Sequence, residues 1–112
     1  MKNLEDAFLP VKEACLATKI STFHYFKSSK SLDHYFVWSE SLEDSSAHSD
    51  NEKTDCILEG TVDFFHKLEN DPAFDLIQME FNKRNIDFYL NSTQYENETG
   101  FIHHEWVVKV RG

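Results

Sequence analysis

The clearest pattern of apolar and polar positions lies in the second half of the chain. Apolar residues alternate with polar ones over about 54–66, recur at helical spacing after Asp71-Pro72, and alternate again over 86–95 and 101–110. Alternation has the period of a strand, whereas spacings of three and four have the period of a helix. The pattern therefore predicts a strand, a helix and a long hairpin with almost no spare residues between them.

Both ends of this predicted helix carry boundary signals. Asp71 can accept hydrogen bonds from free backbone amides, and Pro72 suits the first helical position because its missing amide would be unpaired there. Asn85 can take the left-handed conformation that ends many helices. Between these signals runs one apolar stripe, made of Phe74, Ile77 and Phe81.

The strands on either side of the helix have one face that suits a protein core. The five-residue hairpin loop 96–100 ends in Gly100, which tolerates the backbone conformation of such a turn. Gly60 falls on the inner face of its strand, where a missing side chain indicates a bulge or a close approach by a packed helix. In the last strand, alternation assigns to the core side Ile102, His104, Trp106, Val108 and Val110.

The first half of the chain adds a helix and two strands. Apolar residues recur at helical spacing over about 3–18. Pro10 is the weak point of this helix, which we expect to bend there or to begin again after Leu9. Runs rich in aromatic and β-branched residues at 20–27 and 34–40 predict two strands.

Together these elements predict a single α+β domain over residues 1–112. The order is α-β-β-β-α-β-β, with two helices on one face of a sheet of about five strands. We expect the sheet to be antiparallel, although a mixed sheet is also compatible with the pattern. A mobile acidic loop is expected at about 39–52, where Glu43, Asp44 and Asp50 stand among serines.

Composition and charge limit the classes of function. The chain has 112 residues, of which 40% are hydrophobic, enough for one folded core. Its 20 acidic residues outnumber 11 Lys and Arg, and the net charge of −9 disfavours binding to nucleic-acid phosphates. No run is apolar enough for a membrane span, and the amino terminus lacks a secretory pattern. We therefore expect a cytosolic product in which Cys15 and Cys56 remain thiols.

No group of residues indicates an enzyme, a cofactor or a metal site. His103 and His104 are adjacent on a strand, so they point to opposite faces and cannot share one ion. His66 precedes them, but the sequence contains no His-x-His or Cys-x-x-Cys pair. Asp63 and Glu105 are interpreted as polar residues of an outer sheet face. Structural or solvated roles are therefore predicted for these side chains.

The predicted outer face of the sheet nevertheless carries large apolar groups. Monomeric proteins seldom expose such a band, so it suggests a contact between subunits. Alternatively, the helices and the long loop of the same chain cover both faces of the sheet. Stacking on single-stranded bases is a minor option because of the acidic charge. The candidates for the subunit interface are Phe65, Tyr89, Tyr95, Phe101 and Val107.

Five segments from residue 60 onward carry a family resemblance: Gly60–Lys67, Asp71-Pro72, Ile77-Gln78, Leu90–Gly100 and Ile102–Val107. Together they cover nearly half of the chain and resemble the small tail completion, or tail terminator, proteins of long-tailed bacteriophages and prophages. His104 departs from the family pattern, in which Tyr is frequent at that position.

The resemblance implies a structural virion protein that is not an enzyme. Such a protein closes the head-proximal end of the tail tube as a ring, commonly of six copies, and offers a docking surface for the filled head. Its partners would be further copies of itself, the tail tube protein and a head completion or connector protein. It would reside in the virion tail and, during assembly, in the host cytoplasm. The acidic loop would line the DNA channel or face the neighbouring ring.

Other classes of function remain open at this stage. The main alternative is a small α+β binding or regulatory module that recognises a peptide or ligand on its sheet. An acid–base or metal enzyme has the least support. A pocket with a buried Asp63 or His66 would favour either of these classes over a ring-forming subunit.

Overall fold

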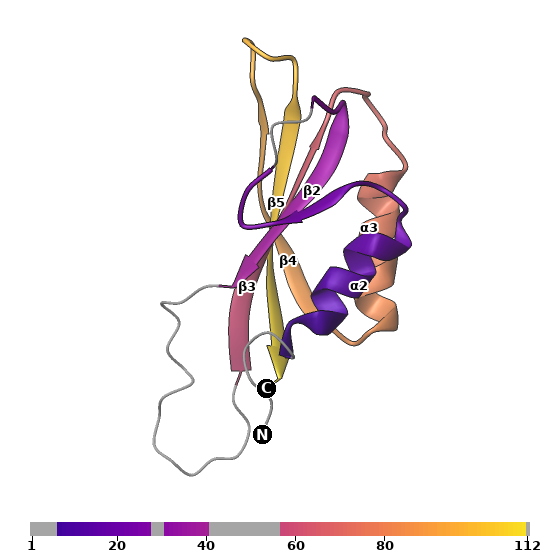
Figure 1. Cartoon of the computed structure of the whole chain (residues 1–112), viewed down its shortest axis with the longest axis vertical. Coiled ribbons are helices and arrows are strands. Elements are labelled where there is room, and N and C mark those ends of the chain that lie inside the picture. Colours follow the sequence, from indigo (N-terminus) through magenta and orange to yellow (C-terminus); the bar gives the residue numbers. More distant parts are fainter. Residues whose placement is uncertain (1–6, 28–30, 41–56, 112) are drawn as a thin grey trace.

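The chain folds into a mixed five-stranded sheet with both described helices on one side of it (Figure 1). The computed structural model describes residues 7–27, 31–40 and 57–111. The predicted α+β class and order of elements are confirmed. The helices are α2 (Leu9–Ala17) and α3 (Ala73–Lys83), and the strands are β1 (Thr22–His24), β2 (His34–Glu40), β3 (Ile57–His66), β4 (Asp87–Tyr95) and β5 (Ile102–Arg111).

The strands lie in the order β1-β2-β3-β5-β4. The pairs β2–β3, β3–β5 and β5–β4 are antiparallel, whereas the edge strand β1 runs parallel to β2. Only three residues of the predicted strand 20–27 belong to β1. Tyr25, with a φ of 72°, turns the chain out of the sheet after His24 and ends the strand early.

Helix α2 begins at Leu9, which places Pro10 in its first turn. A proline there removes no helical hydrogen bond, so the helix runs without the predicted bend and matches the expectation that it begins near Leu9. Its carboxyl end is closed by Thr18, whose Oγ1 donates to the carbonyl of Cys15 at 2.6 Å. Residues 1–6, part of the predicted helix 3–18, lie outside the described residues.

Helix α3 has the boundaries that its sequence signals predict. The amide of Ala73 donates to Oδ1 of Asp71 at 3.0 Å, so the Asp71 side chain satisfies one of the free amides at the helix start. Asn85 follows the helix with a φ of 57°, the left-handed exit conformation. Of the predicted apolar stripe, Ile77 and Phe81 are fully buried and Phe74 is partly buried.

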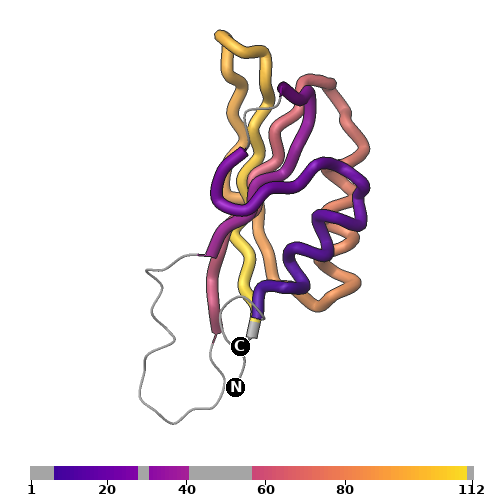
Figure 2. The backbone as a smooth tube through the Cα atoms, viewed as in Figure 1, coloured from indigo at the N-terminus to yellow at the C-terminus, as the bar shows by residue number. Residues whose placement is uncertain are grey.

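The core lies between the two helices, which run side by side, and the inner face of the sheet (Figure 2). Gly60 is required there, because a Cβ would lie 2.4 Å from the Ser39 carbonyl oxygen and 2.6 Å from Cε2 of Phe8. The predicted close approach of helix and strand is thus confirmed at the residue that precedes α2. The largest fully buried side chains are Trp106, Phe8, Phe36, Phe64, Phe81, Ile77, Val11, Val62, Val108 and Cys15.

A β-bulge at Asn91 changes the face on which the end of β4 lies. Tyr89 is paired with Val107 on the outer face, but beyond the bulge Tyr95 is paired with Ile102 on the inner face. The prediction that Tyr95 belongs to the outer face is therefore wrong. Simple alternation fails because a bulge inserts one residue and shifts every later side chain to the opposite side.

The first two residues of the acidic loop predicted at about 39–52 belong to a strand instead. Ser39 and Glu40 are the last residues of β2 and pair with β3. Residues 41–56 lie outside the described part of the chain, and with them lie Glu43, Asp44 and Asp50. The expected role of these three carboxylates therefore stays a prediction.

Candidate functional site

The outer face of the sheet carries a cluster of aromatic rings. Phe65 of β3 stacks on Tyr35 of β2 at 4.8 Å between ring centroids, and Phe101 meets both rings edge-on at 5.9 and 6.3 Å. His103 of β5 stacks on the other side of Phe65 at 4.1 Å. Phe23 of β1 meets Tyr35 edge-on at 6.2 Å. We call these five residues the outer aromatic cluster.

Charged groups surround this cluster. The ammonium groups of Lys27 and Lys67 lie over the rings of Tyr35 and Phe101, at 5.5 and 4.8 Å from the ring centroids. Nε2 of His103 lies 2.9 Å from Oδ1 of Asp63. The hydrogen bond to Asp63 raises the pKa of His103 against the opposing effect of burial. The cluster thus combines apolar rings with groups that can pair with charges on another surface.

Two other predicted interface residues lie further along the same face. Tyr89 and Val107 are cross-strand partners, and Tyr89 is 52% exposed. Between them and the outer aromatic cluster lie the paired residues Asp63 and Glu105. The band predicted from sequence is therefore two apolar areas separated by carboxylates. Both described helices pack against the opposite face, so neither of them covers these areas.

A second arrangement lies on the inner face, where β3 and β5 bring two buried histidines together. Nε2 of His66 lies 2.8 Å from Nε2 of His104. Nδ1 of His66 is 2.8 Å from the carbonyl oxygen of Leu68 and must donate to it, which leaves its Nε2 as an acceptor. His104 then donates from Nε2, and its Nδ1 accepts from the Thr93 hydroxyl at 3.0 Å. All four ring nitrogens of the two histidines therefore have a hydrogen-bond partner.

Burial keeps His104 of this pair from charging easily. It lowers the pKa of His104 to about 4, with smaller contributions from His66 and His103. A pocket of about 310 Å³ opens beside the two rings. Three acidic, three apolar and three other polar residues line it: Glu69, Asp71, Asp75, Pro72, Phe74, Ile102, His66, His104 and Asn70.

Sequence reasoning missed this pair because it compared only the adjacent histidines His103 and His104. The usable signal was the inner-face alternation of two strands, which places His66 and His104 on one side of the sheet.

No cluster of three or more His, Cys, Asp or Glu that could hold a metal ion occurs within residues 7–27, 31–40 and 57–111.

A third set of polar side chains lies at the end of β2. The buried carboxylate of Glu40 receives hydrogen bonds from His24, at 2.8 Å, and from the Tyr25 hydroxyl. Burial alone would raise the pKa of Glu40, but these hydrogen bonds outweigh it and lower the pKa. Trp38 stacks on His24 at 3.9 Å and fixes its ring. Because every member is paired, we interpret the group as structural.

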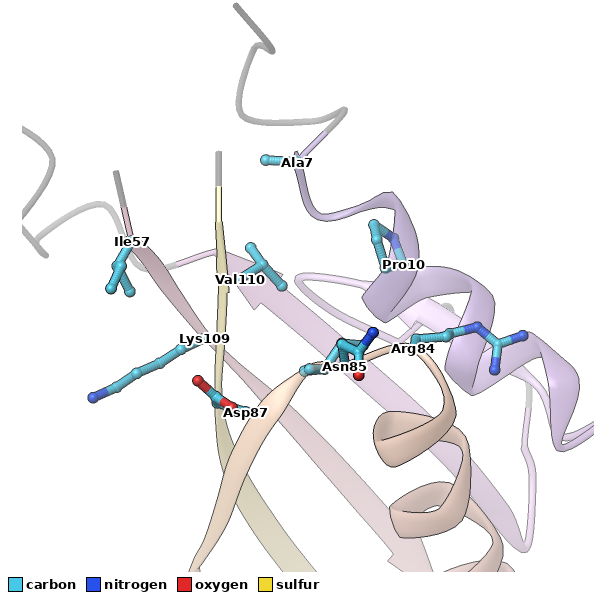
Figure 3. Close-up of a pocket in the computed structure, with 9 residues that line it drawn as sticks. Ala7, Pro10, Ile57, Arg84, Asn85, Asp87, Lys109 and Val110 are labelled. Carbon is cyan, nitrogen blue, oxygen red and sulfur yellow. The ribbon is translucent and has the colours of Figure 1, made fainter. Parts of the chain in front are cut away.

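A further pocket, of about 250 Å³, lies between the start of α2, the start of β4 and the end of β5 (Figure 3). The two cationic side chains that line it form ion pairs with residues outside the pocket: Arg84 with Glu80, and Lys109 with Glu59 at 4.0 Å. Figure 3 shows the Arg84 and Lys109 side chains pointing away from each other. Among the described residues that line this pocket, no groups converge that could perform acid–base chemistry.

Comparison with known proteins adds no family assignment. No protein-family profile matches the chain, and no curated protein matches it significantly. Neither of the helices in the described residues has the length and apolarity to cross a membrane.

Proposed function

We propose that this chain is a structural subunit of a long-tailed phage or prophage that completes the tail. In this proposal it forms a ring at the head-proximal end of the tail tube and mediates the joining of tail to head. The observation that carries the proposal is the outer sheet face, which holds two apolar areas that neither described helix covers. The resemblance of residues 60–107 to tail completion proteins suggests that this contact forms in a phage tail.

A ring requires that one surface of each copy meet a different surface of the next copy. The outer face provides one such surface, with aromatic rings in the cluster and Tyr89 beside Val107. The edge strand β4 provides another, because eight of its nine residues have ladder partners and, among the described strands, these partners all lie in β5. These two surfaces point in different directions, as closure of a ring requires.

The proposed partners follow from this role. The expected ring contains six copies of the chain in all. Each copy would meet the next through its outer face. The tail tube protein would lie below the ring and the head completion or connector protein above it, in the virion tail. The chain would assemble there from the host cytoplasm. We propose no enzymatic activity, cofactor or nucleic-acid specificity for the tail-completing role.

The test uses tail tubes grown from the tube protein encoded beside this chain. We expect the chain to cap one tube end as a ring visible by electron microscopy. Tyr89→Asp should abolish capping, because it places a charge in the outer face without disturbing the core. The matched control is Leu76→Asp on α3, where the side chain is 40% exposed on the helical side of the molecule. The proposal would be contradicted if the Tyr89→Asp variant still capped the tubes. It would also be contradicted if Leu76→Asp abolished capping to the same extent as Tyr89→Asp.

One observation favours the alternative of a small binding module. His66 is buried beside a pocket with apolar and acidic walls, the feature that sequence reasoning associated with ligand binding. The same experiment separates the two functions. A binding module would leave tube ends uncapped, and its activity would respond to changes around His66 and not to Tyr89→Asp.

A further inference from the structure

The two Nε2 atoms of the buried histidine pair face each other from different strands. They lie 2.8 Å apart, with His66 on β3 and His104 on β5. Two imidazole nitrogens bound tetrahedrally to one zinc ion at about 2.0–2.1 Å would be roughly 3.3 Å apart. A separation of about half an ångström more than the present one would therefore bring both nitrogens to bonding distance of a shared ion.

The outer nitrogens of both rings already have hydrogen-bond partners. Nδ1 of His66 donates to the Leu68 carbonyl, and Nδ1 of His104 lies 3.0 Å from the Thr93 hydroxyl oxygen. Metal-binding histidines are generally oriented in this way, with the second nitrogen bonded to a carbonyl or another acceptor. When the His104 proton moves from Nε2 to Nδ1, the Thr93 oxygen accepts it and both Nε2 lone pairs point to one place. The tautomer change conserves the proton.

The adjoining pocket supplies space and negative charge. Its volume of about 310 Å³ admits water, and Glu69 and Asp75 line it together with Asp71. Asp71 is occupied by the Ala73 amide and lies 3.6 Å from Nδ1 of His34. Carboxylates that line the same pocket as the two rings reduce the electrostatic cost of placing a divalent cation beside the pair.

We propose that His66 and His104 form a binding site for one divalent transition-metal ion. Imidazole nitrogens favour zinc, copper or nickel over the oxygen-seeking magnesium and calcium ions. Because the described residues offer no three-ligand cluster, water molecules or a partner's ligand complete the coordination. This inference is independent of the tail-completing role and rests on the pair alone.

The test is a calorimetric titration of the metal-free full chain with Zn²⁺ at pH 7. Six variants are compared, each with one histidine replaced by Gln: His24, His34, His48, His66, His103 and His104. We expect one ion per chain, with at least tenfold weaker binding in His66→Gln and His104→Gln and no more than about twofold change in the other four. Thr93→Val should weaken binding less, because it removes only the group that orients His104.

A second measurement does not depend on how the variants fold. Pulsed electron paramagnetic resonance of Cu²⁺ bound to the unmodified chain should detect two equivalent imidazoles. The proposal is overturned if Zn²⁺ does not bind, if Cu²⁺ shows one imidazole or none, or if the loss of affinity is spread over His24, His34, His48 and His103. Each of these outcomes would leave the tail-completing proposal unaffected.

Discussion

Two neighbouring residues of β5 illustrate how far position on a sheet controls the charge of a side chain. His104 faces the core, where burial lowers its pKa to about 4. His103 faces outward, where the hydrogen bond to Asp63 raises its pKa. Adjacent in sequence, the two imidazoles therefore titrate in opposite directions from the ordinary value near 6.5.

This difference predicts a pH dependence of stability. The folded pKa of His104 lies below the unfolded value, so its contribution is complete above about pH 6.5 and is lost as the pH falls toward 4. The His103 contribution has the opposite sign: it is complete below about 6.5 and is lost as the pH rises through the folded pKa. Urea melts from pH 4 to 8 should show the acid-side loss.

The matched variants separate the two histidines. In His104→Gln we expect the acid-side loss to shrink by roughly 1–2 kcal/mol, less than the full shift implies because the adjoining pocket admits water. His103→Gln should keep that loss and change only the alkaline side. An unchanged acid-side slope in His104→Gln would show that His104 is not the titrating group, since Glu40 loses its contribution only at lower pH.

Gly60 supports a second prediction at the scale of one residue. An added methyl group would meet the backbone oxygen of Ser39 at 2.4 Å, and a backbone atom in a paired strand cannot move aside cheaply. We expect Gly60→Ala to lower the free energy of unfolding by about 3 kcal/mol. Gly100→Ala is the control, because it meets open space and only its φ of 80° opposes it, at about 1 kcal/mol. Equal losses in urea melts would refute the close packing of Phe8 on β3.

At the scale of elements, the segments with end signals were predicted best. Helix α3 has Asp71 at its start and Asn85 at its end, and the structure places its bounds between them. β2 matches the prediction at both ends. The length of β1 and the face on which Tyr95 of β4 lies were misjudged. A left-handed residue at Tyr25 and a bulge at Asn91 leave no regular mark in the alternation of apolar residues.

The start of α3 can be tested directly. Replacing Asp71 by Ala removes the side-chain oxygen that accepts the Ala73 amide, and we expect a loss of about 1 kcal/mol in chemical melts. Asp71→Asn keeps an acceptor at the same place and should cost only a few tenths of that amount. If Asp71→Ala is neutral, the hydrogen bond seen at 3.0 Å contributes nothing to the stability of the helix.

At the scale of the whole molecule, the sheet has one face in the core and one face turned outward. Sequence alternation was enough to assign Trp106 and Val108 to the first face and Phe65 to the second. It could not show that Asp63 and Glu105 divide the outer apolar band, or that His66 meets His104, since both depend on the register between strands. The register depends on which residues of two distant strands pair with each other, and the pattern of a single strand does not carry that information.

We propose that the outer sheet face is buried between copies of the chain at the end of a tail tube. The most direct measurement is a cryo-electron microscopy reconstruction of a tube capped by this protein. We expect a closed ring in which Tyr89, Val107 and the outer aromatic cluster of each copy contact the next copy. A capped end with this face in solvent, or tubes to which the chain does not bind, would contradict the claim.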